Sequence, residues 1–266
     1  MKRFKQKKRY TPKRIYAFSN IESYLQSNKE YAEIIFHHLK DNIKIAQNNQ
    51  IVPRTPEYIS YIQDSLNLHN NQHSRLYPLW ISHASDIDKK HCLCAFESIN
   101  TILHHKILSR SHVRVCKAID NSICYKNKIQ MLPYSKIDEW CHELGHWIEF
   151  HNYKVKLLCN LFLEYRTQNQ EIKEKTIPNQ TFKYKEGNFI YEYCGKICGV
   201  WKKNRDTEIL SKGLEMLFLA PTDLFRKDWE YFTFIICILK GNIIKNLPKY
   251  LFSPNMHCHN KHILKR

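Results

Sequence analysis

Hydrophobic positions along this chain recur mostly with the period of an α-helix. In several long segments apolar residues return every three to four positions, which predicts helices with one apolar face. Shorter segments alternate apolar and polar residues, as half-buried strands do. We therefore expect an α+β fold that is mainly helical. Helices are expected at 19–27, 30–47, 56–68, 88–108, 155–167, 206–219 and 228–239, and strands at 112–118, 122–131, 181–185 and 189–193.

One further amphipathic helix is expected just after Pro133, beginning at Ser135-Lys136-Ile137-Asp138 in a pattern resembling a capping box. At about 100° per residue its apolar side chains gather on one side. That side holds Ile137, Trp140, Cys141, Leu144, Trp147 and Ile148. The opposite side holds Asp138, His142, His146 and Glu149, flanked by Glu139 and Glu143.

Two histidines of this polar side have the spacing of a metal site. His142 and His146 are four residues apart in His142-Glu143-Leu144-Gly145-His146, so both imidazoles reach the same ion from one helical face. Glu143 points to the edge of that face, where it can take a proton from water bound to the metal. Because the chain holds 15 histidines, a solvated polar face that includes two of them by chance is the competing interpretation.

The charge of the chain is strongly positive, with a formal net charge of +17 over 266 residues. Such a charge attracts nucleic acid or anionic lipid, although a lysine-rich genome would produce the same composition. The densest basic segment precedes the first predicted helix and lacks acidic residues. It is either a phosphate-binding arm or a solvated tail, and its candidate binding residues are Lys2, Arg3, Lys5, Lys7, Lys8 and Arg9.

The ten cysteines are expected to be reduced, because several of them fall on apolar helix faces and no secretory signal precedes them. We therefore expect a cytoplasmic location. No apolar run is long enough to span a membrane, since the longest one ends at Lys240. Smaller groups around His91, Cys194 and His257 lack the paired spacing of a zinc finger.

Four regions are expected along the chain. A basic arm at 1–16 precedes a helical N-terminal region at 17–85. The metal-binding domain follows at 86–253, and a polar tail at 254–266 ends the chain. The Asn-rich stretch at 68–73 marks a loop near the boundary of the second and third regions.

On the motif His142-Glu143-Leu144-Gly145-His146, the chain resembles the zincin metallopeptidases. Glu149 and Asn152 stand where one zincin class places glycine and a third histidine. The resemblance is therefore to the gluzincin class, which takes a glutamate from a later helix. Thr207-Glu208-Ile209-Leu210-Ser211 is similar to that segment, which makes Glu208 the expected third ligand and leaves Glu149 as an alternative.

Lys212 departs from the gluzincin pattern, because the family places an aspartate there to orient a histidine. Asp138, Asp206 or Glu215 is expected to replace it, with Glu149 as another contact around the ligands. The segment from Tyr193 to Glu215 is also similar to zincin-like domains of phage head-region and other mobile-element proteins. The order of helix, strands and metal helix likewise matches zincins, whose edge strand pairs with an extended substrate.

The resemblance implies one Zn²⁺ ion and hydrolysis of peptide bonds in a peptide or protein substrate. Glu143 would be the general base, and the donor to the developing oxyanion would be Tyr193, with Tyr191 and Lys196 as alternatives. Two other functions stay open. One is a zincin-like binding or assembly module with weak or no activity, and the other is a protein that contacts nucleic acid through its N-terminal arm.

Overall fold

The N-terminal part of the chain forms three helices, as the apolar periodicity predicts. They are α1 (Pro12–Ser27), α2 (Lys29–Asn48) and α3 (Pro56–Leu66). The computed structural model describes residues 12–66, 75–108, 110–177, 180–196 and 207–242. On α2 the buried positions follow the helical period: Ala32, Ile35, Phe36, Leu39, Ile43 and Ala46. The loop expected at 68–73 lies outside the described residues.

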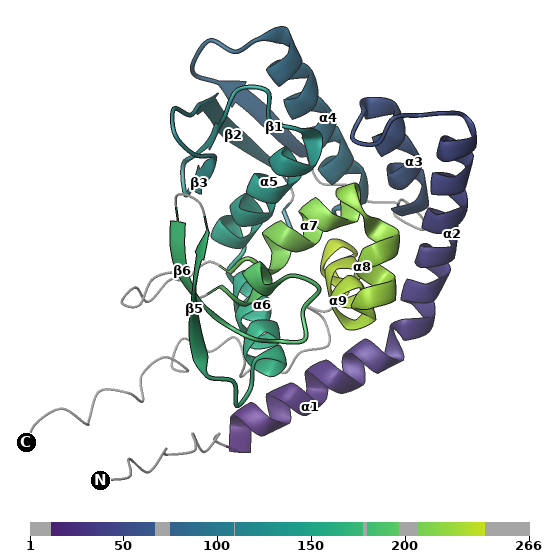
Figure 1. Ribbon diagram of the computed structural model, residues 1–266, viewed down its shortest axis with the longest axis vertical. Coiled ribbons are helices and arrows are strands. Elements are labelled where there is room, and N and C mark those ends of the chain that lie inside the picture. Colours follow the sequence, from purple (N-terminus) through teal and green to yellow (C-terminus); the bar gives the residue numbers. More distant parts are fainter. Residues whose placement is uncertain (1–11, 67–74, 109, 178–179, 197–206, 243–266) are drawn as a thin grey trace, which may run out of the picture.

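A mixed four-stranded sheet is the main β element (Figure 1). Its strands are β1 (Arg75–Trp80), β2 (Arg110–Lys117), β3 (Ile123–Tyr125) and β4 (Lys128–Met131), in the order β1-β2-β4-β3. β2 is parallel to β1 and to β4, whereas β3 is antiparallel to β4. β3 is therefore an antiparallel edge strand.

Two predictions for this sheet were wrong. The single strand expected at 122–131 is a hairpin, because residues 126 and 127 turn the chain between β3 and β4. β1 was not predicted at all. It is short and contains Pro78, and a proline argues against a strand except at a sheet edge, which is where β1 lies.

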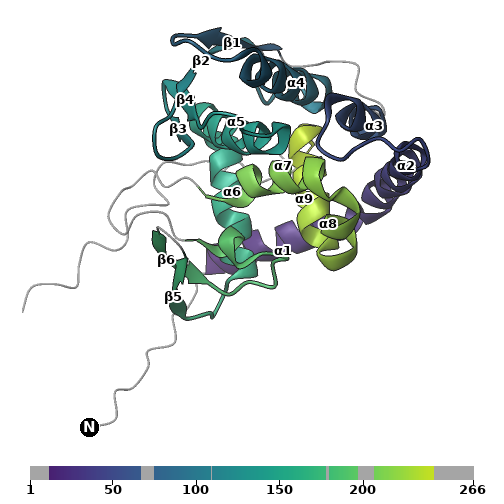
Figure 2. The same cartoon turned by 45° about the horizontal axis from the view of Figure 1, so that its top comes forward.

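Helices α4 (Asp86–Ile102) and α5 (Ile137–His151) both pack against the sheet (Figure 2). Ser85 caps α4, its hydroxyl oxygen accepting a hydrogen bond from the Asp88 backbone N–H at 3.1 Å. α4 ends at Ile102, before the expected end at 108. In α5, the Glu139 carboxylate accepts a hydrogen bond from the Lys136 backbone N–H at 2.7 Å, as in a capping box.

A second hairpin follows α6 (Tyr153–Arg166), but not where the sequence predicted it. β5 (Ile172–Ile177) pairs with β6 (Gln180–Lys185), so the strand expected at 181–185 has its partner before it in the chain. The strand expected at 189–193 is instead irregular chain leading into the 3-10 helix η1 (Glu192–Gly195). The alternation of apolar and polar residues after Gly187 predicted a strand that pairs with 181–185. Alternation alone does not specify which segment pairs with β6.

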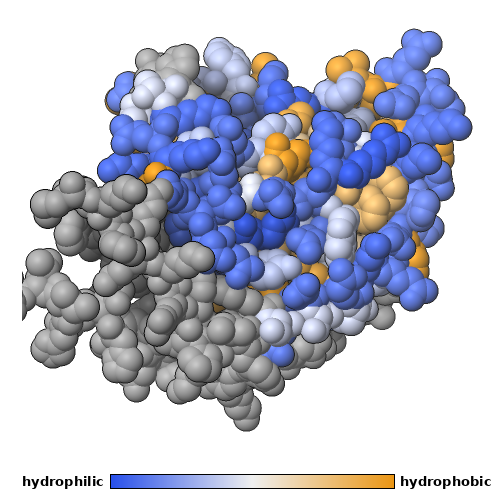
Figure 3. All heavy atoms as spheres, turned by 60° about the horizontal axis from the view of Figure 1, so that its bottom comes forward, coloured by the Kyte–Doolittle hydropathy of each residue, from blue (hydrophilic) through white to orange (hydrophobic). Residues whose placement is uncertain are grey.

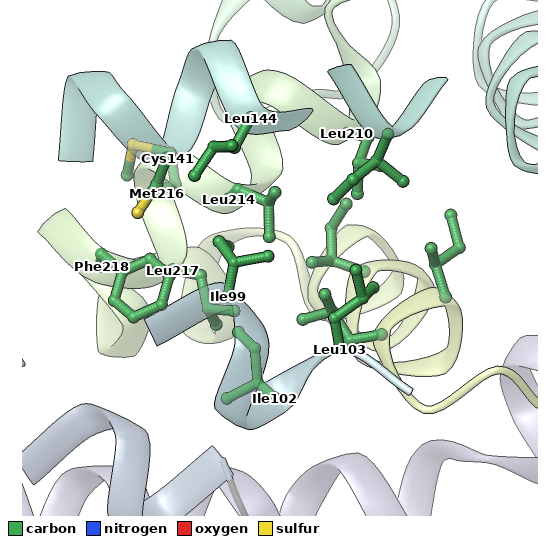
Figure 4. Packing of buried hydrophobic residues seen from close by; sticks show 14 of the residues in the cluster. Ile99, Ile102, Leu103, Cys141, Leu144, Leu210, Leu214, Met216, Leu217 and Phe218 are labelled. Atoms are coloured by element: carbon green, nitrogen blue, oxygen red, sulfur yellow. The ribbon is translucent and has the colours of Figure 1, made fainter. Parts of the chain in front are cut away.

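Three C-terminal helices complete the described chain: α7 (Ile209–Leu219), α8 (Pro221–Lys227) and α9 (Trp229–Leu239). Pro221 was expected only to end α7, but it also starts α8 as its first residue. Asp228 caps α9 by accepting a hydrogen bond from the Tyr231 backbone N–H at 3.1 Å. Figure 4 shows apolar side chains of α5 and α7, among them Leu144 and Leu214, meeting in the core near Ile99 of α4.

One cluster of buried apolar side chains extends from Ile21 to Leu239, through both the expected N-terminal region and the expected metal-binding domain. The boundary at 85/86 stays a prediction.

The surface in Figure 3 is mostly hydrophilic, with small separate apolar patches. All eight cysteines that the structure describes are free thiols. Among the described helices, none combines the length and apolar character that crossing a membrane requires. The α+β, mainly helical class is confirmed.

Candidate metal site

The structure brings His142, His146 and Glu208 together. Each offers one ligand atom, and the three atoms lie within 4.8 Å of one another. The two imidazoles extend from consecutive turns of α5, with ring centroids 5.0 Å apart. Glu208 immediately precedes α7 and is 3% exposed. This is the only group of three or more potential ligands among the residues that the structure describes.

The distances within this group suit a tetrahedral ion. Glu208 Oε2 lies 3.5 Å from His142 Nε2 and 3.3 Å from His146 Nε2. Metal bonds of about 2.0–2.1 Å at tetrahedral angles place neighbouring ligand atoms about 3.4 Å apart. Two imidazoles and one carboxylate are also a common ligand set for zinc with an open fourth position. The donor set and its spacing therefore fit a divalent cation.

The electrostatics of the three side chains are strongly coupled. Burial would lower the pKa of His146, but the hydrogen bond and charge of Glu208 raise it to about 9. Burial likewise opposes the charged form of Glu208, yet His146, His142 and Lys196 hold the pKa of this carboxyl well below its usual range. Glu208 is thus ionised at neutral pH, as a metal ligand must be.

Helices α5 and α7 are so close at position 145 that only glycine fits there. Gly145 lies between His142 and His146 in the sequence of α5. A Cβ at Gly145 would lie 2.5 Å from Ser211 Cα and 2.7 Å from Ser211 N. This contact places the start of α7, and with it Glu208, over the histidines. A glycine in a helix interior costs about 1 kcal/mol relative to alanine. A glycine inside a predicted helix indicates close packing, so Gly145 could have predicted this contact from the sequence.

Glu149 holds the segment that carries Glu208. Its buried carboxylate accepts hydrogen bonds from the Thr207 backbone N–H at 3.1 Å, the Thr207 hydroxyl at 2.9 Å and the Leu210 backbone N–H at 3.3 Å. Burial raises the pKa of Glu149 to about 7. Glu149 thus acts on the loop before α7, while Glu208 is the carboxylate that joins the histidines.

Glu215 lies beside His142. It takes the position of the histidine-orienting aspartate of the gluzincin pattern, which this chain replaces with Lys212. Its Oε2 lies 2.8 Å from His142 Nδ1, so Nε2 faces Glu208 and the metal position. Lys212 in turn donates to both oxygens of Glu215, at 2.6 and 2.7 Å. Burial opposes ionisation of Glu215, but the hydrogen bond to His142 and the charge of Lys212 lower its pKa.

Asp138 lies elsewhere. Its Oδ2 accepts a hydrogen bond from Arg54 at 2.5 Å, so its partner is an arginine of the α2–α3 loop and not one of the two histidines. Arg54 was not predicted from the sequence, because no local pattern connects it to α5. Ser211 was not predicted either, although its hydroxyl donates to Glu208 Oε2 at 3.2 Å. Asp206 and residues 1–11 of the arm expected at 1–16 lie outside the described residues, whereas residues 12–16 belong to α1, which begins before the helix start expected at 19.

Glu143 is buried beside the two histidines. It is 6% exposed, and burial raises its pKa despite the neighbouring imidazoles. Its carboxylate accepts a hydrogen bond from the backbone of Cys124 in β3, and its Oε2 has no hydrogen-bond partner among the described residues. A buried carboxylate oxygen without a partner is costly and marks a position where water or another donor fits.

Lys196 contacts the second carboxylate oxygen of Glu208. Lys196 Nζ lies 3.1 Å from Glu208 Oε1, and it also donates to the Tyr193 hydroxyl. Glu208 therefore directs one oxygen to the histidines and the other to Lys196. Tyr191, the third donor considered from sequence, is 43% exposed. Of the three candidates, Lys196 and Tyr193 are the ones that the structure joins to the site.

Comparison of the chain with known protein families, with curated proteins and with solved structures found no match. What the structure supports is thus the site itself: a His142/His146/Glu208 group that can hold a metal ion.

Proposed function

We propose that this protein is a zinc-dependent hydrolase of peptide bonds with a gluzincin-like site. The observation that carries the proposal is the distance of Glu208 Oε2 from the two imidazole nitrogens, 3.5 and 3.3 Å. Three protein ligands leave a fourth position for water or substrate, which distinguishes catalytic from structural zinc sites. A divalent cation held there supplies Lewis acidity, which polarises a carbonyl group and lowers the pKa of coordinated water to about 7.

Glu143 is the general base of the proposed reaction. Its Oε2 is buried, beside the histidines and without a partner among the described residues. Burial raises the pKa of Glu143 above its ordinary value, which brings the carboxylate closer to the proton affinity that an acid-base group needs near neutral pH. Glu143 accepts a proton from water and then returns it to the leaving amine.

Lys196 and Tyr193 supply the charge stabilisation. Lys196 Nζ contacts Glu208 Oε1, whereas the histidines face Oε2, and the Tyr193 hydroxyl accepts a further hydrogen bond from the same ammonium group. Donors fixed before reaction stabilise a developing oxyanion without reorganising. We assign this role to Lys196, with Tyr193 orienting it.

The edge strand β3 is the proposed substrate-binding strand. It is the last strand of the sheet and lies against α5, and its Cys124 backbone bonds to Glu143. An extended peptide that pairs with this edge would place its backbone carbonyl groups next to the general base. This arrangement favours a peptide over a small-molecule substrate.

Metal analysis combined with variants of α5 tests the proposal. The purified full chain should bind one equivalent of Zn²⁺ and cleave members of a fluorescence-quenched peptide library. Glu143→Gln should keep the metal and lose turnover, whereas His146→Ala should lose both. His151→Ala is the matched control, since His151 lies on the same helix, outside the His142/His146/Glu208 group, where it bonds to the Trp147 carbonyl and stacks on the Trp147 ring.

Three results separate the proposal from its competitors. Turnover retained in Glu143→Gln would exclude the assigned base. One bound zinc without cleavage of any peptide in the library would favour the non-catalytic binding module. Failure of the full chain to bind stoichiometric zinc, with His151→Ala and the unmodified chain equally folded, would reject the site altogether.

A further inference from the structure

One face of the four-stranded sheet is packed against helices, and the opposite face is exposed. α4 and α5 contact the sheet on the side of Leu76, Val113, Val115 and Ile129, all at most 1% exposed. Figure 2 shows the sheet at the upper left of the molecule, with α4 and α5 to its right. We call the opposite side the outer sheet face. Its residues are Arg75, Tyr77, Leu79, Arg110, His112, Arg114, Cys116, Ile123, Tyr125, Lys128 and Gln130, of which only Cys116 is buried.

The outer sheet face carries basic side chains without neighbouring acidic side chains in the strands. The four strands contain no aspartate or glutamate. Arg75 and Arg110 stand directly opposite each other in the register of β1 and β2, a pairing of like charges that destabilises a sheet. Among the described residues, neither they nor Arg114 and Lys128 form an ion pair. The β5–β6 hairpin differs, because Lys173 and Lys183 there pair with glutamates.

Aromatic rings lie among these cations. Tyr77 is 40% exposed and Tyr125 is 42% exposed, one at each edge of the sheet. The Tyr77 ring stacks on His112 at a centroid distance of 5.6 Å, with the Arg110 guanidinium 5.7 Å from its centroid. Lys128 Nζ lies 5.5 Å from the centroid of Tyr125. Both tyrosines are thus held in place by cations that are themselves exposed or half-buried.

We propose that the outer sheet face binds single-stranded nucleic acid. Bases stack on exposed aromatic rings of a sheet, and arginine and lysine neutralise the phosphates between them. A broad sheet face does not enter the major groove of a duplex as a helix or two-stranded ribbon does. This site is separate from the metal site, whose histidines lie on α5, on the opposite side of the sheet.

The binding of a 5′-labelled 12-nucleotide oligo-dT to the full chain, followed by fluorescence anisotropy from 50 to 200 mM NaCl, tests the proposal. Arg110→Gln/Arg114→Gln should weaken binding about tenfold and reduce the salt slope by about 1.4, the value for two lost phosphate contacts on a single strand. Lys173→Gln/Lys183→Gln removes the same charge from the hairpin and should change affinity less than about twofold.

Tyr77→Leu tests the stacking. It keeps an apolar side chain on an edge strand, so the sheet should fold, and binding should weaken about tenfold. Tyr153→Leu is its control, since Tyr153 is 50% exposed at the start of α6 and lies outside the outer sheet face. No variant should have a thermal midpoint below that of the unmodified chain, which separates lost binding from lost folding.

Several results would overturn the proposal. Equal weakening by both double variants would mean that net charge alone attracts the oligonucleotide. Duplex DNA bound as tightly as oligo-dT, with Tyr77→Leu unchanged, would exclude stacking. Binding to phosphatidylserine vesicles without binding to oligo-dT would identify the face as a membrane surface instead.

Discussion

Replacing Gly145 with alanine should destabilise the protein and disrupt the metal site, although the same change usually stabilises a helix. At an ordinary helix position Gly→Ala contributes about 1 kcal/mol of stability. Here the new Cβ would lie 2.5 Å from Ser211 Cα, which is 0.9 Å short of the 3.4 Å at which ordinary contact begins. The obstacle is backbone, so α5 and α7 must move apart.

The size of the effect follows from that displacement. Overpacking in a buried contact costs about 1–3 kcal/mol, which outweighs the helix-propensity gain. A shift of 0.9 Å directed away from α5 would also carry Glu208 Oε2 from 3.3–3.5 Å to more than 4 Å from the imidazole nitrogens. A tetrahedral ion needs about 3.4 Å there, so we expect zinc affinity to fall by about tenfold or more.

Urea unfolding of the metal-free protein and competition titration with a zinc chelator measure the two effects. Gly213→Ala is the matched control on the other side of α7. Its Cβ would lie 2.3 Å from Ile235 Cδ1, 2.5 Å from Ile235 Cγ1 and 3.2 Å from Tyr231 Oη, which are side-chain atoms and not backbone. We expect a modest loss of stability there and unchanged zinc affinity. A Gly145→Ala protein that is more stable than the unmodified chain, or that binds zinc within twofold of it, would refute the reasoning.

Two further predictions concern Glu215 and Lys240. Glu215→Ala removes the 2.8 Å contact that orients His142 and should lower zinc affinity about 10- to 100-fold in a chelator titration, whereas unchanged affinity would show that His142 needs no orienting partner. Burial lowers the pKa of Lys240 to about 8, so the contribution of Lys240 to stability should rise between about pH 8 and 10.5, where only the unfolded chain keeps this proton. Burial raises the pKa of cysteines such as Cys194, which acts in the opposite direction, so the effect is measured as the difference in unfolding free energy between the unmodified chain and Lys240→Met. That difference should change by up to about 3 kcal/mol across the window, and a constant difference would contradict the assignment.

Local patterns predicted the helices well because each depends on neighbours three and four residues away. The apolar side of α5 is buried as its period required, and His142 and His146 share one face because they are four residues apart. The choice of Glu208 rested on likeness to a known segment, and the structure does place it with the histidines. The peptidase activity and the zinc itself stay proposals.

Strand pairing was predicted poorly, since it depends on contacts between distant segments. Nothing near Arg75 shows that it will lie beside Arg110, and the alternation after Gly187 does not reveal that β6 pairs with β5. The polar side of α5 was also open to two interpretations. Glu149 is buried there against the start of α7, and Glu143 is buried beside Cys124 of β3. Both contacts join segments that are distant in the sequence, so no local pattern reveals them.

The sequence by itself therefore determined where the helices form and which face of α5 carries the two imidazoles, because a helix places residues by their spacing alone. Only the tertiary structure decided which carboxylate joins them. Glu149, Glu208 and Glu215 are of one chemical type, and their roles differ because the packing of α7 on α5 directs Glu208 to both histidines, Glu215 to the far side of His142 and Glu149 to the backbone before α7.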